Sequence, residues 1–142
     1  MKNSNLIFIF FVLSLVSSTA CVSVKKQHNM SDAELKERLI GTWYIDDEIS
    51  YFEVTYKADG TSEAFDHRKL PNGALSGRVY KLYAKWDIIN GVHIIRDNVS
   101  VPSGYFANPN AVSRDTILYI ADDKYEYYSH NVNDTSIRYR KK

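Results

Sequence analysis

Apolar and polar residues alternate at a period of two through most of the chain after Thr42, and this pattern constrains the fold more than any other feature. Such alternation puts successive side chains on opposite faces of a strand with one buried face. The Asp59-Gly60 and Asn90-Gly91 dipeptides are typical of tight hairpin turns. The predicted strands begin near Trp43 and continue through residues 52–57, 61–66, 78–88, 92–96, 114–121, 124–130 and 135–140.

Two segments between these strands lack the alternation. The first is a polar link that runs from Asp66-His67 past Pro71, where we expect a surface hydrogen bond between the carboxylate and the imidazole. The second covers residues 98–113 and holds Pro102, Gly104 and Pro109, so we expect a long loop there.

A short helix is expected before the first strand. Ser31 and Glu34 have the spacing of a capping box, in which each side chain accepts a hydrogen bond from the backbone of the other. Leu35 and Leu39 then share one face of the helix. Gly41 is placed to end the helix in a left-handed turn.

About eight short antiparallel strands in one domain favour a closed sheet. An open meander would leave unpaired edges, whereas an up-and-down barrel has none. We therefore predict an all-β, up-and-down antiparallel barrel over residues 31–142, with the short helix at its N-terminus. An open β-sandwich is the alternative that the strand pattern also allows.

The N-terminus predicts export. Lys2 precedes an apolar stretch over residues 6–16 that only Ser14 interrupts. The stretch is well below the roughly 20 residues that a membrane-spanning helix needs. We interpret residues 1–20 as a signal peptide.

Cys21, the single cysteine of the chain, follows this signal directly. The segment resembles a bacterial lipobox, in which the cysteine thiol is acylated before cleavage, with Ser18 in place of the usual leucine. Ordinary signal peptidase is the competing interpretation, because Ser18 and Ala20 are both small. The cysteine favours lipidation, with residues 21–30 as a tether and the bacterial cell envelope as the location. Val22 after the cysteine favours the outer membrane in a double-membraned cell.

Charge and motif content exclude several functions. The 18 basic and 17 acidic residues become equal in number when Lys2 leaves with the signal peptide, so no long-range field would attract nucleic acid. No catalytic motif is present, and we expect neither an enzyme nor a cofactor. Asp46-Asp47-Glu48 lacks the ligand spacing of a calcium loop and predicts a solvated hairpin end. No metal site is expected from the isolated histidines His28, His67, His93 and His130.

Gly41-Thr42-Trp43, between the predicted helix and the first strand, resembles the Gly-x-Trp motif of lipocalins and the wider calycin barrels. The Asp59-Gly60 hairpin, residues 86–91 and residues 137–140 are similar to small bacterial lipocalin-like domains. The resemblance implies that Trp43 closes one barrel end under an arginine of the last strand. Arg138 and Arg140 both remain candidates, because the register of that strand is open.

Two functions follow from such a barrel. An eight-stranded interior either fills with side chains or holds one small ligand. The first hypothesis is binding of a small apolar or aromatic ligand, with residues 98–113 as a partial lid. Its candidate lining residues are Tyr56, Tyr80, Leu82, Trp86 and Tyr119. The second hypothesis is a filled barrel that contacts another envelope protein through the aromatic residues Tyr83, Tyr105, Phe106 and Tyr128.

Overall fold

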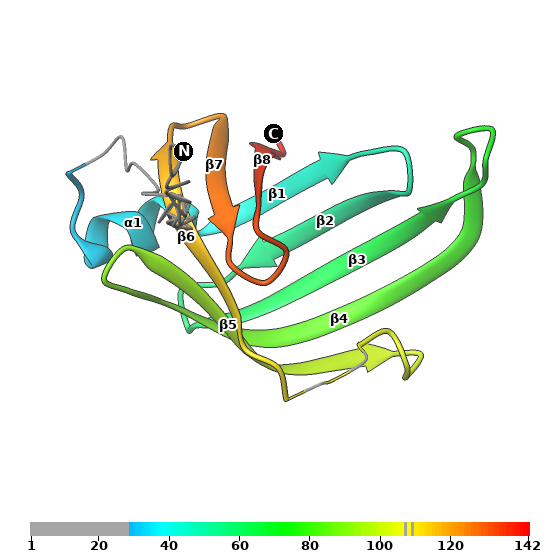
Figure 1. The fold of residues 1–142 in the computed structure, drawn as a ribbon, viewed down its shortest axis with the longest axis horizontal. Helices are drawn as coiled ribbons and strands as arrows, with labels where there is room; N and C mark the ends of the chain where they lie inside the picture. Colours follow the sequence, from blue (N-terminus) through cyan, green and yellow to red (C-terminus); the bar gives the residue numbers. More distant parts are fainter. Residues whose placement is uncertain (1–28, 107, 109) are drawn as a thin grey trace, which may run out of the picture.

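The computed structural model describes residues 29–106, 108 and 110–142, which form one helix and a closed antiparallel barrel (Figure 1). Each strand pairs with its neighbour in the chain, and β1 pairs with β8. The predicted up-and-down barrel is therefore confirmed, and the sandwich is excluded. The elements are α1 (Asp32–Leu39), β1 (Gly41–Asp46), β2 (Ser50–Tyr56), β3 (Thr61–Lys69), β4 (Leu75–Ile89), β5 (Val92–Val101), β6 (Ser113–Ile120), β7 (Lys124–Ser129) and β8 (Asp134–Arg140).

The N-terminal helix begins with the predicted capping box. The Ser31 hydroxyl accepts a hydrogen bond from the Glu34 amide, and the Glu34 carboxylate accepts one from the Ser31 amide. The prediction for Gly41 was wrong. The helix is capped by Ile40, and Gly41 is the first residue of β1 with φ of 130°.

Gly41 is required for a different reason, which is the close approach of Arg140. A Cβ atom at position 41 would lie 2.6 Å from the Arg140 Nη1 atom. A side chain there would displace the guanidinium, and the positive φ is itself costly for any residue but glycine.

Helix α1 covers one end of the barrel. Leu35 and Leu39 are fully buried on its inner face. The Asp32 carboxylate accepts hydrogen bonds from the amides of Asn90 and Gly91 in the β4–β5 turn. This contact ties the start of the helix to the barrel, and we call the covered end the closed end.

Two strands extend beyond their predicted limits. β3 continues to Lys69, so Asp66 is buried inside the barrel wall rather than exposed in a link. β5 continues to Val101, which corrects the predicted start of the long loop at residue 98. In both cases long-range pairing with β4 decides the strand length, because Lys69 pairs with Leu75 and Val101 pairs with Lys81.

Two buried tryptophans pack at the closed end. Trp43 is fully buried, and its Nε1 donates to the Leu39 carbonyl at 2.7 Å. Trp86 donates through Nε1 to the carbonyls of Lys57 and Thr61 in the β2–β3 turn. Both indoles thus fill the closed end with their polar groups satisfied, as buried tryptophans require.

Candidate functional site

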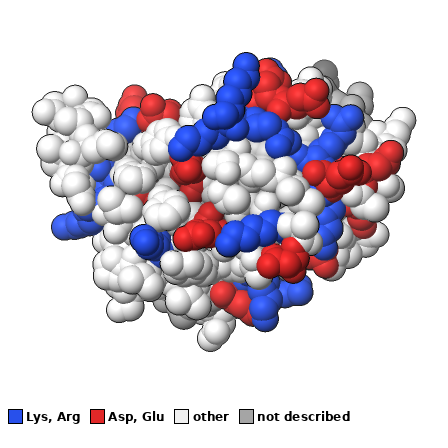
Figure 2. Space-filling model, turned by 180° about the vertical axis from the view of Figure 1, so that it is seen from behind, with Lys and Arg blue, Asp and Glu red and all other residues white. Residues whose placement is uncertain are grey.

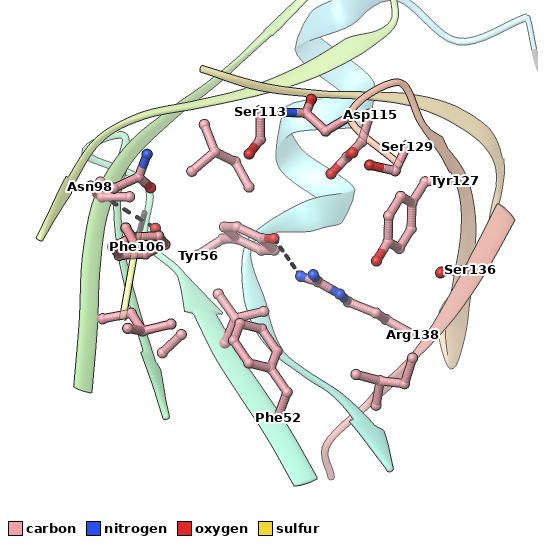
Figure 3. A pocket seen from close by; sticks show the side chains of 18 of the residues that line it. Phe52, Tyr56, Asn98, Phe106, Ser113, Asp115, Tyr127, Ser129, Ser136 and Arg138 are labelled. Atoms are coloured by element: carbon pink, nitrogen blue, oxygen red, sulfur yellow. Dashed lines mark hydrogen bonds between the residues drawn. The ribbon is translucent and has the colours of Figure 1, made fainter. Parts of the chain in front are cut away.

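The opposite half of the barrel is hollow. A cavity of about 590 Å³ lies inside the strands and reaches the exposed β1–β2 and β7–β8 turns, which form its mouth. This volume is in the range of small-molecule pockets. The cavity places polar and apolar side chains from different strands around one space (Figure 3). Its apolar wall includes Phe52, Val54, Leu82, Ile95 and Phe106.

The five predicted lining residues do not all face this cavity. Tyr56 and Leu82 line it. Tyr80 lies in a second, more polar hollow beside Arg68 and Arg78.

The other two predicted lining residues lie elsewhere. Trp86 belongs to the packed closed end, where its ring centroid is 5.2 Å from that of Tyr56. Tyr119 is half-buried, and the Lys124 ammonium lies 5.9 Å from its ring centroid.

Trp43 is paired with Arg140, which resolves the choice that the sequence left open. The two residues are register partners on β1 and β8, and the guanidinium carbon lies 4.1 Å from the centroid of the indole ring. Arg140 also donates to the carbonyls of Ile40, the C-cap residue of α1, and of Arg38, in the last turn of α1. It therefore combines a cation–π contact with capping of helix carbonyls.

Arg138 precedes Arg140 by two residues on the same face of β8, so it lies deeper inside the barrel wall than the seam with β1 and does not contact Trp43 in the way that Arg140 does. Its guanidinium extends into the cavity, where Nη1 donates to the Tyr56 hydroxyl at 2.9 Å (Figure 3). The guanidinium carbon lies 5.1 Å from the ring centroid of Phe52 and 5.2 Å from that of Tyr127. The Nε atom is buried and has no hydrogen-bond partner among the described residues.

Arg138 carries its charge inside the barrel. Burial alone would lower its pKa, but Tyr125, Tyr56, Tyr127 and Asp115 together raise the pKa well above its ordinary value. From the sequence, Arg138 was expected only as a partner for Trp43. The alternation along residues 134–140 puts Arg138 on the inward face together with Arg140, and this signal could have indicated its place in the cavity.

Asp115 lies on the polar wall with Ser113 and Ser129 (Figure 3). Burial raises the pKa of the Asp115 carboxyl, while the Ser129 hydroxyl and the Arg138 charge act in the opposite direction. The raised pKa means that this carboxyl holds a proton more readily than an exposed aspartate. Among the described residues, the interior of the cavity thus holds one cationic group, Arg138, and one carboxyl with a raised pKa, Asp115.

His93 lies just below the cavity. It is almost completely buried, with its ring edge-on to Tyr56 at 4.9 Å and to Trp86 at 5.8 Å between centroids. Burial first, and then the Arg138 charge, lower its pKa to about 3. The imidazole is therefore neutral at physiological pH and behaves as a core aromatic residue.

The loop after β5 contributes part of the cavity wall. Tyr105 and Phe106 line the cavity and pack against each other with centroids 5.0 Å apart. Burial and the neighbouring Asp66 carboxylate raise the pKa of Tyr105 to about 12. Arg68 forms an ion pair with Asp66 at 3.0 Å and lies 5.4 Å from the Tyr105 ring. These contacts hold the loop against the mouth.

Other features of the described chain are less distinctive. Asp47 accepts hydrogen bonds from the amides of Ile49 and Ser50, as expected for a hairpin end. Across residues 29–106, 108 and 110–142, no three His, Cys, Asp or Glu side chains are grouped to hold a metal ion. No helix within that part of the chain is long and apolar enough to cross a membrane. Cys21 and the predicted signal peptide lie outside it.

Comparison with known proteins assigns no family. No family model matches the sequence, and no curated protein matches it at a significant level. The barrel with its N-terminal helix is consistent with a calycin-type fold. The site must therefore be interpreted from its own geometry.

Proposed function

We propose that this chain is a lipid-anchored envelope protein that binds one small apolar or aromatic ligand inside its barrel, without performing chemistry on it. The observation that carries the proposal is the contrast between the two ends, since the closed end is packed with indoles while the mouth half contains the cavity. Side chains of a purely structural barrel would be expected to fill both halves.

The placement of the loop aromatics supports binding over protein contact. Tyr105 and Phe106, which were considered as anchors for a protein partner, are half-buried and line the cavity, and a third such residue, Tyr83, lines it while remaining partly exposed. On the face that Figure 2 displays, basic and acidic side chains are interspersed and no patch of one sign dominates. Neither feature favours a large docking surface.

Ligand binding is tested with a neutral fluorescent apolar probe titrated into the purified protein. We expect saturable binding that Ala64→Phe abolishes, because Ala64 is a buried residue of the cavity wall. Ala74→Phe adds the same side chain at an exposed turn position and serves as the matched control. Equal probe binding by wild type and Ala64→Phe would contradict the proposal.

The lipid anchor is tested separately in cells. We expect wild type to incorporate labelled palmitate and to fractionate with membranes, and Cys21→Ser to lose both properties. A fully membrane-bound Cys21→Ser protein would refute lipidation at this residue. The result does not depend on whether the cavity holds a ligand.

A further inference from the structure

We propose that the cavity ligand is an amphiphile with one singly charged oxygen-anion head, such as a carboxylate, which lies against Arg138 while its apolar body lies against Phe52 and Leu82. This inference rests on the proposed function, since it concerns the ligand of the same cavity. It names the chemical class of the ligand, which the shape of the cavity alone does not.

The first observation is that Arg138 has no carboxylate partner. No described residue forms an ion pair with its guanidinium within 4.0 Å. A charge taken out of water is costly unless it is paired. A guanidinium that lines a cavity without a counter-ion is therefore suited to an anion that enters from outside.

The second observation concerns hydrogen bonds. A guanidinium has five N–H donors, and of the bonds within the described residues only one, from Nη1 to Tyr56, uses them. The Nε donor is buried and unpartnered. Planar oxygen anions are the groups that guanidinium donors match best.

The third observation fixes the charge of the head. Among the described residues, Arg138 is the single cationic residue lining this cavity, and the acidic residues that line it are Asp115 in the interior and Asp47 at the mouth. One positive charge matches one negative charge, and a doubly charged head would meet additional repulsion from both carboxylates. The head is therefore a monoanion.

The fourth observation is the separation of the walls. Ser113, Asp115 and Ser129 lie on one side of Arg138, and Phe52 lies on the other (Figure 3). The hydroxyls of Ser113 and Ser129 can donate further hydrogen bonds to an oxygen anion. The apolar wall receives the rest of the molecule, so the arrangement suits a head and a body that differ in polarity.

The test measures the affinity of the purified full chain for decanoate and for neutral decanamide, both below their micelle concentrations, by calorimetry. We expect decanoate to bind at least ~10-fold more tightly, the factor typical of hydrogen bonds to a charged group. Arg138→Met should reduce this preference to less than about twofold, whereas Arg96→Met, at an exposed position, should leave it unchanged. Near-ultraviolet circular dichroism verifies the fold of each variant.

Asp115→Asn provides a test that does not require the loss of Arg138. It should raise the affinity for decanoate several-fold and leave that for decanamide unchanged, because it removes an opposing carboxyl. Equal binding of the two ligands by wild type, or a preference that survives Arg138→Met, would overturn the inference while leaving the proposed function intact. Failure of both ligands to bind while the neutral fluorescent probe still binds would overturn the inference, and failure of the probe as well would refute the proposed function.

A third ligand distinguishes two sources of such a head. Decanoyl lysophosphatidylglycerol carries a singly charged phosphodiester on an acyl chain of the same length. Tighter binding of this lipid than of decanoate, lost in Arg138→Met, would support the inference and identify a phospholipid head. Tighter binding of decanoate would support it and identify a free acid.

Discussion

The guanidinium of Arg140 lies 4.1 Å from the centroid of the Trp43 ring, directly at the seam where β8 meets β1. The pair joins the first and last strands and also receives the end of α1 through the carbonyls of Ile40 and Arg38. The N-terminal helix and strand and the C-terminal strand therefore depend on one side chain.

Arg140→Ala should destabilise the protein by about 2–4 kcal/mol, because it removes a cation–π contact and two charge-assisted hydrogen bonds. Chemical denaturation followed by tryptophan fluorescence measures the change in the free energy of unfolding. Arg96→Ala removes an exposed arginine and should cost less than about 0.5 kcal/mol. Similar losses in the two variants would show that the seam does not depend on Arg140.

Gly41→Ala should destabilise the protein by at least about 2 kcal/mol, since the new Cβ would lie 2.6 Å from the Arg140 Nη1 atom and the backbone has φ of 130°. Gly73→Ala is the control, with positive φ but nothing within 4 Å of the Cβ, and should cost about 1–2 kcal/mol. A double-mutant cycle isolates the contact. The cost of Gly41→Ala should fall in an Arg140→Ala background, and strict additivity would contradict the proposed clash.

Asp32→Ala should loosen the helix from the barrel. The carboxylate accepts hydrogen bonds from the Asn90 and Gly91 amides at 2.8 and 2.7 Å, and we expect a loss of about 1–2 kcal/mol. Faster hydrogen exchange at these two amides is the direct measurement. Glu37→Ala, at an exposed position of the same helix, should leave their exchange unchanged.

Acid should destabilise the fold through His93. The unfolded chain binds a proton on this imidazole near pH 6.5, whereas the folded protein does so only near pH 3. The unfolded state therefore holds more protons between these values, and stability falls as the pH falls through this window. Between pH 6.5 and pH 5 the expected loss from this group is about 1.5 kcal/mol.

His93→Phe keeps a buried ring but cannot titrate, so its unfolding free energy should depend less on pH over the same interval. The difference between the pH slopes of wild type and variant isolates the contribution of His93. Identical slopes for wild type and His93→Phe would contradict the assignment.

The barrel could be predicted from the sequence because local chemistry and tertiary structure agree along most strands. The period-two alternation and the Asp59-Gly60 and Asn90-Gly91 turns act within a few residues of each other. The capping box at Ser31 is equally local. Strand ends were less predictable, because β3 and β5 are extended by pairing with β4, and Asp66 thereby becomes buried.

The site was harder to predict than the fold. Tyr56 and Leu82 could be placed at the cavity by their apolar alternation, whereas Trp86, which has the same alternation, packs at the closed end. Depth along a strand depends on how the strands are staggered, which no local pattern records. The same uncertainty left Arg138 and Arg140 equivalent until the register of β8 against β1 was known.

The last strand of the barrel ends on the side opposite the mouth of the cavity. α1 covers the closed end, and β8 finishes at the same end, beside Trp43 (Figure 1). A reporter domain fused after Lys142 would therefore project away from the opening. Attachment of the protein to a sensor chip through its C-terminus would likewise present the opening to solution, which suits the binding measurements that the cavity invites.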